Sequence, residues 1–85
     1  MPDDQPNAAL PAMPLAMALV GQTVVFCGVR GGGAGLTHRL AEMGLTPGMT
    51  MEVLNRGPGP FILSVRGTRL VLGRGMVGRI LVRPA

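Results

Sequence analysis

Short runs in which apolar and polar side chains alternate mark much of this chain. Residues 49–54 place Met49, Met51 and Val53 on one side and polar residues on the other. Residues 61–66 repeat this period of two, which is the period of side chains along a β-strand. One face of such a strand covers a core while the other meets water. Both segments are therefore predicted to be half-buried antiparallel strands.

Three further strands complete the pattern. Residues 22–30 are rich in β-branched side chains and are apolar on both faces, which indicates a well-buried strand. After a turn at 67–68 the chain returns over residues 69–72, a spacing typical of a tight hairpin. Residues 79–83 form the last predicted strand, and residues 73–78 before it are expected to be a short irregular or 3₁₀ turn.

One segment shows the period of a helix instead. Leu36, Leu40 and Met43 recur at positions i, i+4 and i+7, which gives a single apolar stripe on a helix of about two turns. Gly44 follows as the expected stop, since glycine enters the left-handed conformation without a Cβ clash. Pro47 then prevents the helix from continuing.

A chain of 85 residues is long enough for one compact domain only. Five short strands with one helix between the first and second are arranged most economically as a strongly bent small barrel, because closure removes unpaired sheet edges. We therefore predict a mainly β fold: a flexible N-terminal arm over residues 1–13 and a single domain over residues 14–85.

The charge of the chain invites a nucleic-acid interpretation, which other features oppose. The net charge is +4, and the eight basic residues are arginines spread along the whole chain. Aromatic side chains, on which bases stack, make up 2% of the residues. The arginines are thus predicted to be solvated outward positions, and no nucleic acid is expected as a partner.

The cysteine content and the hydropathy of the chain indicate where the protein is located. Cys27 is the only cysteine, so no intramolecular disulfide is possible and a cytoplasmic location is expected. The apolar stretch over residues 10–20 is interrupted by Pro11 and Pro14 and is too short to cross a bilayer, which needs about 20 residues. Direct membrane insertion is therefore not expected.

The residues of catalysis are scarce in this sequence. The glycine-rich stretch over residues 31–35 lacks the lysine of a nucleotide-triphosphate loop, so a flexible turn is the favoured interpretation. His38 and Cys27 lie on different predicted elements, and no spacing brings Glu42 and Glu52 together. We conclude that the chain is not an enzyme and requires no cofactor.

A weak metal-binding site is the one candidate for a chemical site in this sequence. His38 and Glu42 lie four residues apart on one face of the predicted helix. An iron(II) or zinc(II) site needs roughly four donors, so Asp3, Asp4 or residues of a second copy would have to contribute, and such a site could be shared between two chains. The alternative is a solvated His–Glu pair on the surface of the helix.

The segment of residues 39–48, Arg-Leu-Ala-Glu-Met-Gly-Leu-Thr-Pro-Gly, resembles the FeoA family of bacterial ferrous iron transport. The similarity extends over residues 15–82 and includes the Leu-Val-Leu-Gly run at 70–73. It implies a five-stranded SH3-like barrel with a short inserted helix. It also implies a regulatory role at the membrane transporter FeoB, whose cytosolic G-protein domain is the expected partner. The same domain resembles the C-terminal module of iron-dependent repressors.

The inward stripe of the helix leaves His38, Arg39 and Glu42 pointing outward, and we expect a partner to contact these three side chains together with Leu45. The predicted role is modulation of iron(II) uptake without catalysis. Three alternatives stay open. They are a metal-sensing domain acting through His38 and the carboxylates, a small basic nucleic-acid-binding barrel, and a homodimer formed through a Met-rich apolar surface.

Overall fold

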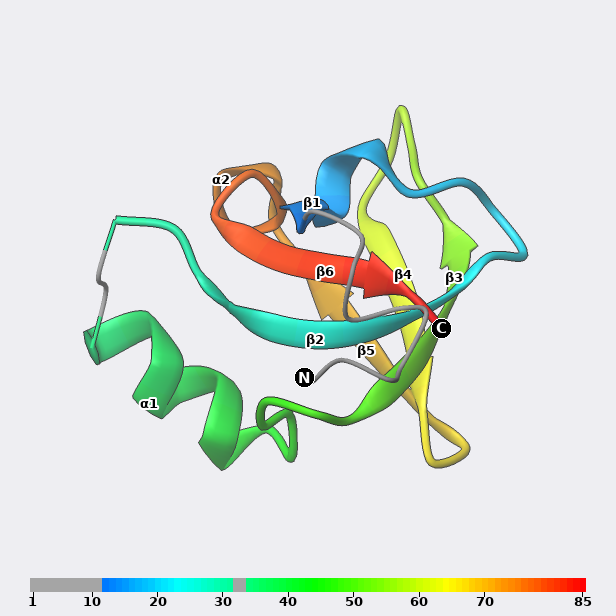
Figure 1. Ribbon diagram of the computed structural model, residues 1–85. Coiled ribbons are helices and arrows are strands. Elements are labelled where there is room, and N and C mark those ends of the chain that lie inside the picture. The colour runs from blue at the N-terminus through cyan, green and yellow to red at the C-terminus, as the bar shows by residue number, and fades with distance from the viewer. Residues whose placement is uncertain (1–11, 32–33) are drawn as a thin grey trace.

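The structure is a computed structural model in which residues 12–31 and 34–85 are described (Figure 1). In chain order the elements are β1 (Met13–Pro14), the 3₁₀ helix η2 (Leu15–Met17), β2 (Thr23–Val29), α1 (Ala34–Glu42), β3 (Thr50–Asn55), β4 (Phe61–Val65), β5 (Thr68–Leu72), α2 (Arg74–Val77) and β6 (Ile80–Pro84). The expected order of strands, with one helix inserted after the first long strand, is confirmed.

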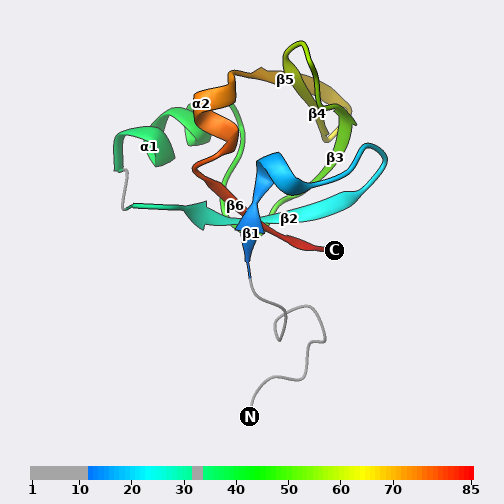
Figure 2. The ribbon, with the colours of Figure 1, turned by 90° about the horizontal axis from the view of Figure 1, so that it is seen from above.

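A single antiparallel sheet of six strands forms the body of the molecule, in the order β1-β6-β2-β3-β4-β5. The fold is mainly β and SH3-like, as predicted, although the strands at the two ends of this order, β1 and β5, are not hydrogen-bonded to each other. Register shifts between Phe26 and Gly28 of β2 and between Val53 and Asn55 of β3 interrupt the ladders. Such bulges increase the local twist, which helps the sheet to curl around its core (Figure 2).

The sixth strand is β1, which the sequence pattern did not predict. Met13 pairs with Val82 and Pro14 with Leu81, so Met13 belongs to the sheet and not to an N-terminal arm. A strand of two residues is too short to show alternation, and Pro14 is tolerated because it lies on an edge strand. Residues 1–11 of the predicted arm lie outside the described residues.

The core lies inside the bend of the sheet and is made of aliphatic side chains and two phenylalanines. Its buried members are Leu15, Ala18, Val24, Phe26, Leu40, Leu45, Met51, Val53, Phe61, Leu63, Val65, Leu72, Val77, Ile80 and Val82. Each strand from β2 to β6 contributes alternate residues to this core, which confirms the inward faces predicted for residues 49–54, 61–66 and 79–83.

The hairpin between β4 and β5 turns one residue earlier than the predicted turn at 67–68. Arg66 and Gly67 form its two-residue connection, with φ angles of 54° and 80°. Two consecutive positive φ angles are characteristic of the type I′ turn, whose twist matches that of the flanking strands. Thr68 is already in β5 and pairs with Val65.

The end of α1 follows the predicted glycine stop. Gly44 has a φ of 92°, its N–H donates to the carbonyl of Ala41 at 3.0 Å, and the N–H of Leu45 donates to the carbonyl of Leu40 at 2.8 Å. These two bonds form a Schellman motif, which satisfies the last carbonyls of the helix. Met43 lies just beyond the helix and is 37% exposed, so its predicted inward position was wrong.

Residues 73–78, expected as an irregular or 3₁₀ turn, contain the single α-helical turn α2. The two helices lie at the same end of the sheet (Figure 2). No helix in the described part of the chain is long and apolar enough to cross a membrane.

Candidate partner-binding site

The outward face of α1 carries the three polar residues that the sequence singled out. His38, Arg39 and Glu42 are all exposed. The Nε2 atom of His38 lies 3.1 Å from Oε2 of Glu42, and the two side chains are 76% and 64% exposed. A pair so open to water contributes little to stability, so these side chains are available for contact with another molecule.

Leu45 does not belong to this exposed face. Its side chain is 0% exposed and is part of the core. The physical reason is the Schellman motif, in which the residue after the left-handed glycine turns back against the last turn of the helix. Leu40 and Leu45, joined by the backbone bond of that motif, are both fully buried. The predicted contact of Leu45 with a partner is therefore corrected, because a folded domain does not present this side chain.

Two of the predicted metal donors lie together in the described structure. His38 and Glu42 lie close together, while Asp3 and Asp4 fall outside the described residues. Within residues 12–31 and 34–85, no three His, Cys, Asp or Glu side chains are grouped so that they could hold a metal ion. A closed coordination sphere of roughly four donors would need ligands from elsewhere.

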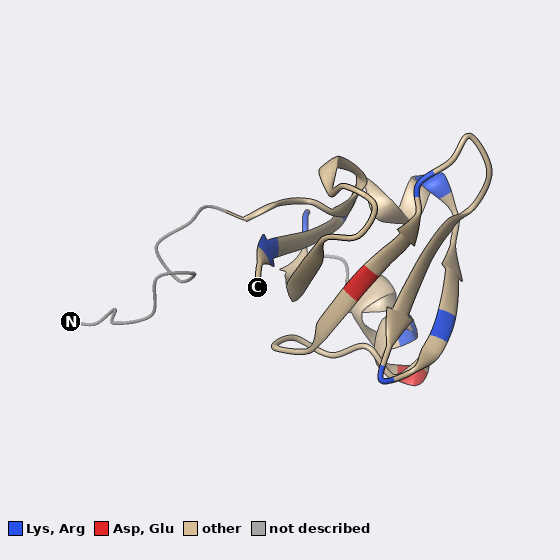
Figure 3. Ribbon diagram, turned by 90° about the vertical axis from the view of Figure 1, so that its right-hand side faces the viewer, with Lys and Arg blue, Asp and Glu red and all other residues tan. Residues whose placement is uncertain are grey.

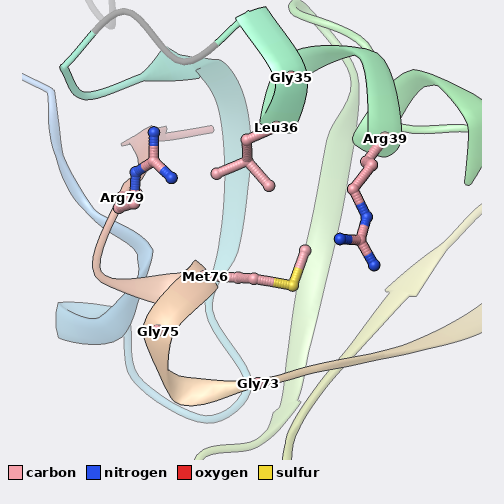
Figure 4. Close-up of a pocket in the computed structure, with 7 residues that line it drawn as sticks. All are labelled: Gly35, Leu36, Arg39, Gly73, Gly75, Met76 and Arg79. Carbon is pink, nitrogen blue, oxygen red and sulfur yellow. The ribbon is translucent and has the colours of Figure 1, made fainter.

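A groove of about 480 Å³ separates α1 from α2 (Figure 4). It is lined by Gly35, Leu36, Arg39, Gly73, Gly75, Met76 and Arg79. We call it the α1–α2 groove. Leu36 and Met76 are half-buried and pack against the core, so the apolar part of the groove is fixed by the fold. In Figure 4 these two side chains lie between those of Arg79 and Arg39.

The two arginines of the α1–α2 groove have no partner within the described chain. The guanidinium groups of Arg39 and Arg79 make no hydrogen bond or ion pair with any described residue. Glu42, the acidic residue of α1, is already paired with His38. The groove therefore combines an apolar floor with two uncompensated positive charges.

A second groove, of about 400 Å³, lies on the other side of α2 and contains arginines in a different state. It is lined by Ala16, Arg56, Gly57, Phe61, Arg74 and Val77, and we call it the η2–α2 groove. Arg56 donates from Nη2 to the carbonyl oxygen of Ala16 at 3.0 Å, and Arg74 donates from Nη2 to that of Pro58 at 2.9 Å. Arg56 thus links the end of β3 to η2, and Arg74 links α2 to the loop between β3 and β4.

Sequence reasoning found one side of the α1–α2 groove and missed the other. Arg39 was among the predicted contact residues, whereas Met76 lies in the segment predicted as a turn and Arg79 begins the last predicted strand. Residues 35–39 and 73–79 are far apart in the chain, and no spacing rule relates them. The arginines themselves are distributed around the fold, as predicted from their scatter along the sequence (Figure 3).

The fold defines a class, that of small SH3-like β domains with an inserted helix. The FeoA domain matches this chain over residues 13–84, and the chain belongs to the FeoA family. The general role of this family is in ferrous iron transport. Its members are small accessory domains and not enzymes, which confirms the non-catalytic prediction.

Individual relatives agree with this assignment. The chain is 35% identical over 72 residues to the "Putative Fe(2+) transport protein A" of Methanocaldococcus jannaschii, covering 85% of this chain and 87% of that protein. The crystal structure of an iron uptake regulatory protein (FeoA) matches with a TM-score of 0.77 and 38% identity, over 89% of this chain and 100% of that one. A manganese-dependent transcriptional repressor, 19% identical, matches with a TM-score of 0.77 over 88% of this chain and 42% of its own, which shows a shared fold.

Proposed function

We propose that this domain docks on the cytosolic region of the membrane transporter FeoB and modulates its uptake of iron(II), with the G-protein domain of the transporter as the contact. The domain acts in the cytoplasm and catalyses no reaction itself. Membership of the FeoA family supports the link to ferrous iron transport. The observation that carries the docking proposal is the exposed face of α1.

This face has the properties of a recognition surface. Among residues 12–31 and 34–85, the Arg39 side chain is exposed and has no partner, and His38 beside it is paired with Glu42. A guanidinium held on a helix offers up to five donors in a fixed geometry, and it becomes stronger as a binding group when a partner excludes water. Contacts of this kind set the specificity and the association rate of protein complexes.

The proposal is tested by calorimetric titration of the domain with the isolated G domain of the same organism's FeoB, with and without guanine nucleotide and iron(II). We expect saturable binding that Arg39→Glu weakens at least tenfold. Arg69→Glu is the matched control, because it makes the same charge change at an exposed position on β5.

The alternative outcomes of this titration are also informative. Circular dichroism first confirms that each variant is folded. Absence of binding by the folded wild-type domain under every condition would overturn the proposed contact with the G domain. Equal weakening by Arg39→Glu and Arg69→Glu would show that binding depends on net charge and not on the face of α1.

The proposed modulation is tested in cells that lack this chain. Uptake of radiolabelled iron(II) is measured after complementation with the wild-type gene, with Arg39→Glu or with Arg69→Glu. We expect Arg69→Glu to restore the wild-type rate and Arg39→Glu to fail. An uptake rate that does not depend on the presence of the chain would contradict the proposal.

A further inference from the structure

The α1–α2 groove has a size and lining that fit a short stretch of another polypeptide. Its volume of about 480 Å³ lies within the range of roughly 300–1,000 Å³ that is common for ligand sites, which accommodates a few side chains and not a whole helix. Three of its lining residues, Gly35, Gly73 and Gly75, have no side chain, and a Cβ added at any of them meets no atom within 4 Å. Backbone is therefore open to close approach.

The apolar part of the groove can bury an aliphatic side chain. Leu36 and Met76 face this space while resting on the core, so they are already held in place before a ligand arrives. Methionine is unbranched and polarisable and adapts to ligands of different shape. Burial of apolar surface between these two residues would supply affinity without requiring the fold to rearrange.

The charged part of the groove favours a ligand of negative charge. Arg39 and Arg79 stand on either side of the apolar residues in Figure 4, and neither has an internal partner among the residues that the structure describes. Guanidinium groups bind carboxylates through paired, charge-assisted hydrogen bonds. An acidic ligand is favoured over a neutral or basic one.

We infer that the α1–α2 groove binds an extended segment of a partner protein in which acidic side chains flank an aliphatic one. The aliphatic side chain lies between Leu36 and Met76, and the carboxylates on either side bind Arg39 and Arg79. This inference rests on the proposed function, because the docking partner is the protein that would supply the segment.

A second copy of this chain fits the groove poorly. The chain carries a net charge of +4, so two copies repel each other at a surface with two arginines that have no partner in the described part of the chain. The acidic side chains among the described residues are Glu42, which is paired with His38, and Glu52 on β3. The groove therefore has the charge that complements an acidic partner.

A peptide titration followed by NMR tests the inference directly. The probe is a peptide with the central sequence Glu-Glu-Leu-Glu-Glu, added to the isotopically labelled full chain. We expect saturable shifts of the amide resonances of Gly35, Leu36, Gly75 and Met76, and an affinity that falls as salt is raised. Replacing the central leucine by serine, or the glutamates by lysines, should each weaken binding at least fivefold.

Two variants on the α2 side distinguish binding in this groove from binding at the outer face of α1. Arg79→Glu should weaken peptide binding at least tenfold, and Gly75→Gln should do so by filling the groove without changing the charge. Arg69→Glu is again the matched control and should bind as the wild type does. Inorganic phosphate alone should not reproduce the shifts, because it lacks the aliphatic group.

Each outcome decides between the two proposals. No peptide binding, or shifts that phosphate reproduces, would overturn the groove inference while leaving docking intact. FeoB G-domain binding that is lost in Arg39→Glu but unchanged in Arg79→Glu and Gly75→Gln would do the same. Peptide binding in the groove without any G-domain binding would keep the groove and overturn the docking proposal.

Discussion

The two grooves on either side of α2 contain the same kind of residue in two different states. In the η2–α2 groove, Arg56 and Arg74 donate to the backbone carbonyls of Ala16 and Pro58. In the α1–α2 groove, the guanidinium groups of Arg39 and Arg79 have no partner among the described residues. The volumes of the two grooves, about 400 and 480 Å³, are similar.

The difference shows that the role of an arginine is fixed by which backbone groups lie within its reach. A backbone carbonyl within reach, such as that of Ala16 in η2 or Pro58 in a loop, accepts a hydrogen bond from a guanidinium group, and the arginine then stabilises the fold. No described acceptor is bonded to the guanidinium group of Arg39 or Arg79, so within the described chain these two groups are open to another molecule. The η2–α2 groove is thus held together by its arginines, whereas the α1–α2 groove presents them.

Phe61→Ala should give the largest loss of stability among these variants. Phe61 lines the η2–α2 groove and is 3% exposed, so the substitution leaves a cavity in the core and should lower the free energy of unfolding by about 3–5 kcal/mol. Urea denaturation measures this loss. Val71→Ala, at a position that is 60% exposed, is the control and should change stability by less than about 0.5 kcal/mol. Equal effects of the two would show that the η2–α2 groove is not anchored in the core.

Substituting a glycine by alanine should change stability differently in the two grooves. Gly57 in the η2–α2 groove has a φ of 126°, and a Cβ there would lie 3.1 Å from the carbonyl oxygen of Gly59. Gly57→Ala should therefore cost about 1–2 kcal/mol. Gly75 in the α1–α2 groove is helical and has open space, so Gly75→Ala should be neutral or raise stability by about 0.4–1 kcal/mol. Thermal melts compare the two, and a destabilising Gly75→Ala would contradict the open geometry of this groove.

Substituting the arginines by alanine should likewise lower stability in the η2–α2 groove and leave it nearly unchanged in the α1–α2 groove. Arg56→Ala and Arg74→Ala each remove a hydrogen bond from a charged donor and should cost about 0.5–1.5 kcal/mol, a modest value because the side chains are exposed. This corresponds to a drop of a few degrees in Tm for a domain of this size. Arg39→Ala and Arg79→Ala should stay within about 0.5 kcal/mol of the wild type. A similar loss in all four variants would remove the distinction between the grooves.

The smallest effect is expected for the ion pair next to the α1–α2 groove. Glu42→Gln removes the contact of 3.1 Å to His38, and both side chains are largely exposed. The change in unfolding free energy should be below about 0.5 kcal/mol, and salt should reduce it further. Denaturation at low and high ionic strength measures it. A loss several times larger would mean that this pair stabilises the helix and is not free to meet a partner.

Much of the fold could be predicted because its signals are local. The alternation of residues 49–54 and 61–66 identified which side chains are buried, since a strand has a period of two whatever it packs against. Gly44 marked the end of α1, since its left-handed conformation depends on the absence of a Cβ. The family resemblance, carried by residues 39–48, also depended on a continuous stretch of sequence.

The errors lie where a residue's position depends on distant parts of the chain. β1 is a strand only because β6 lies beside it, and its two residues carry no pattern of their own. Leu45 appeared to extend the outer face of the helix, but the Schellman motif turns it into the core. The other three predicted contact residues, His38, Arg39 and Glu42, are exposed. Asp3 and Asp4, which were predicted only as further metal donors, fall outside the described residues.

The sequence by itself determined the five longer strands, α1 with its glycine stop, and the excess of arginine. Side-chain periodicity, backbone conformation and net charge are properties of short segments or of composition. Only the tertiary structure decided which arginines are engaged and which are free. The carbonyls that Arg56 and Arg74 reach are those of Ala16 and Pro58. Arg39 and Arg79 come to one groove because the curled sheet brings α1 and α2 to the same end of the molecule. Hydrogen bonds and charge pairs act over a few ångströms in space, and that proximity is created by the packing of the sheet.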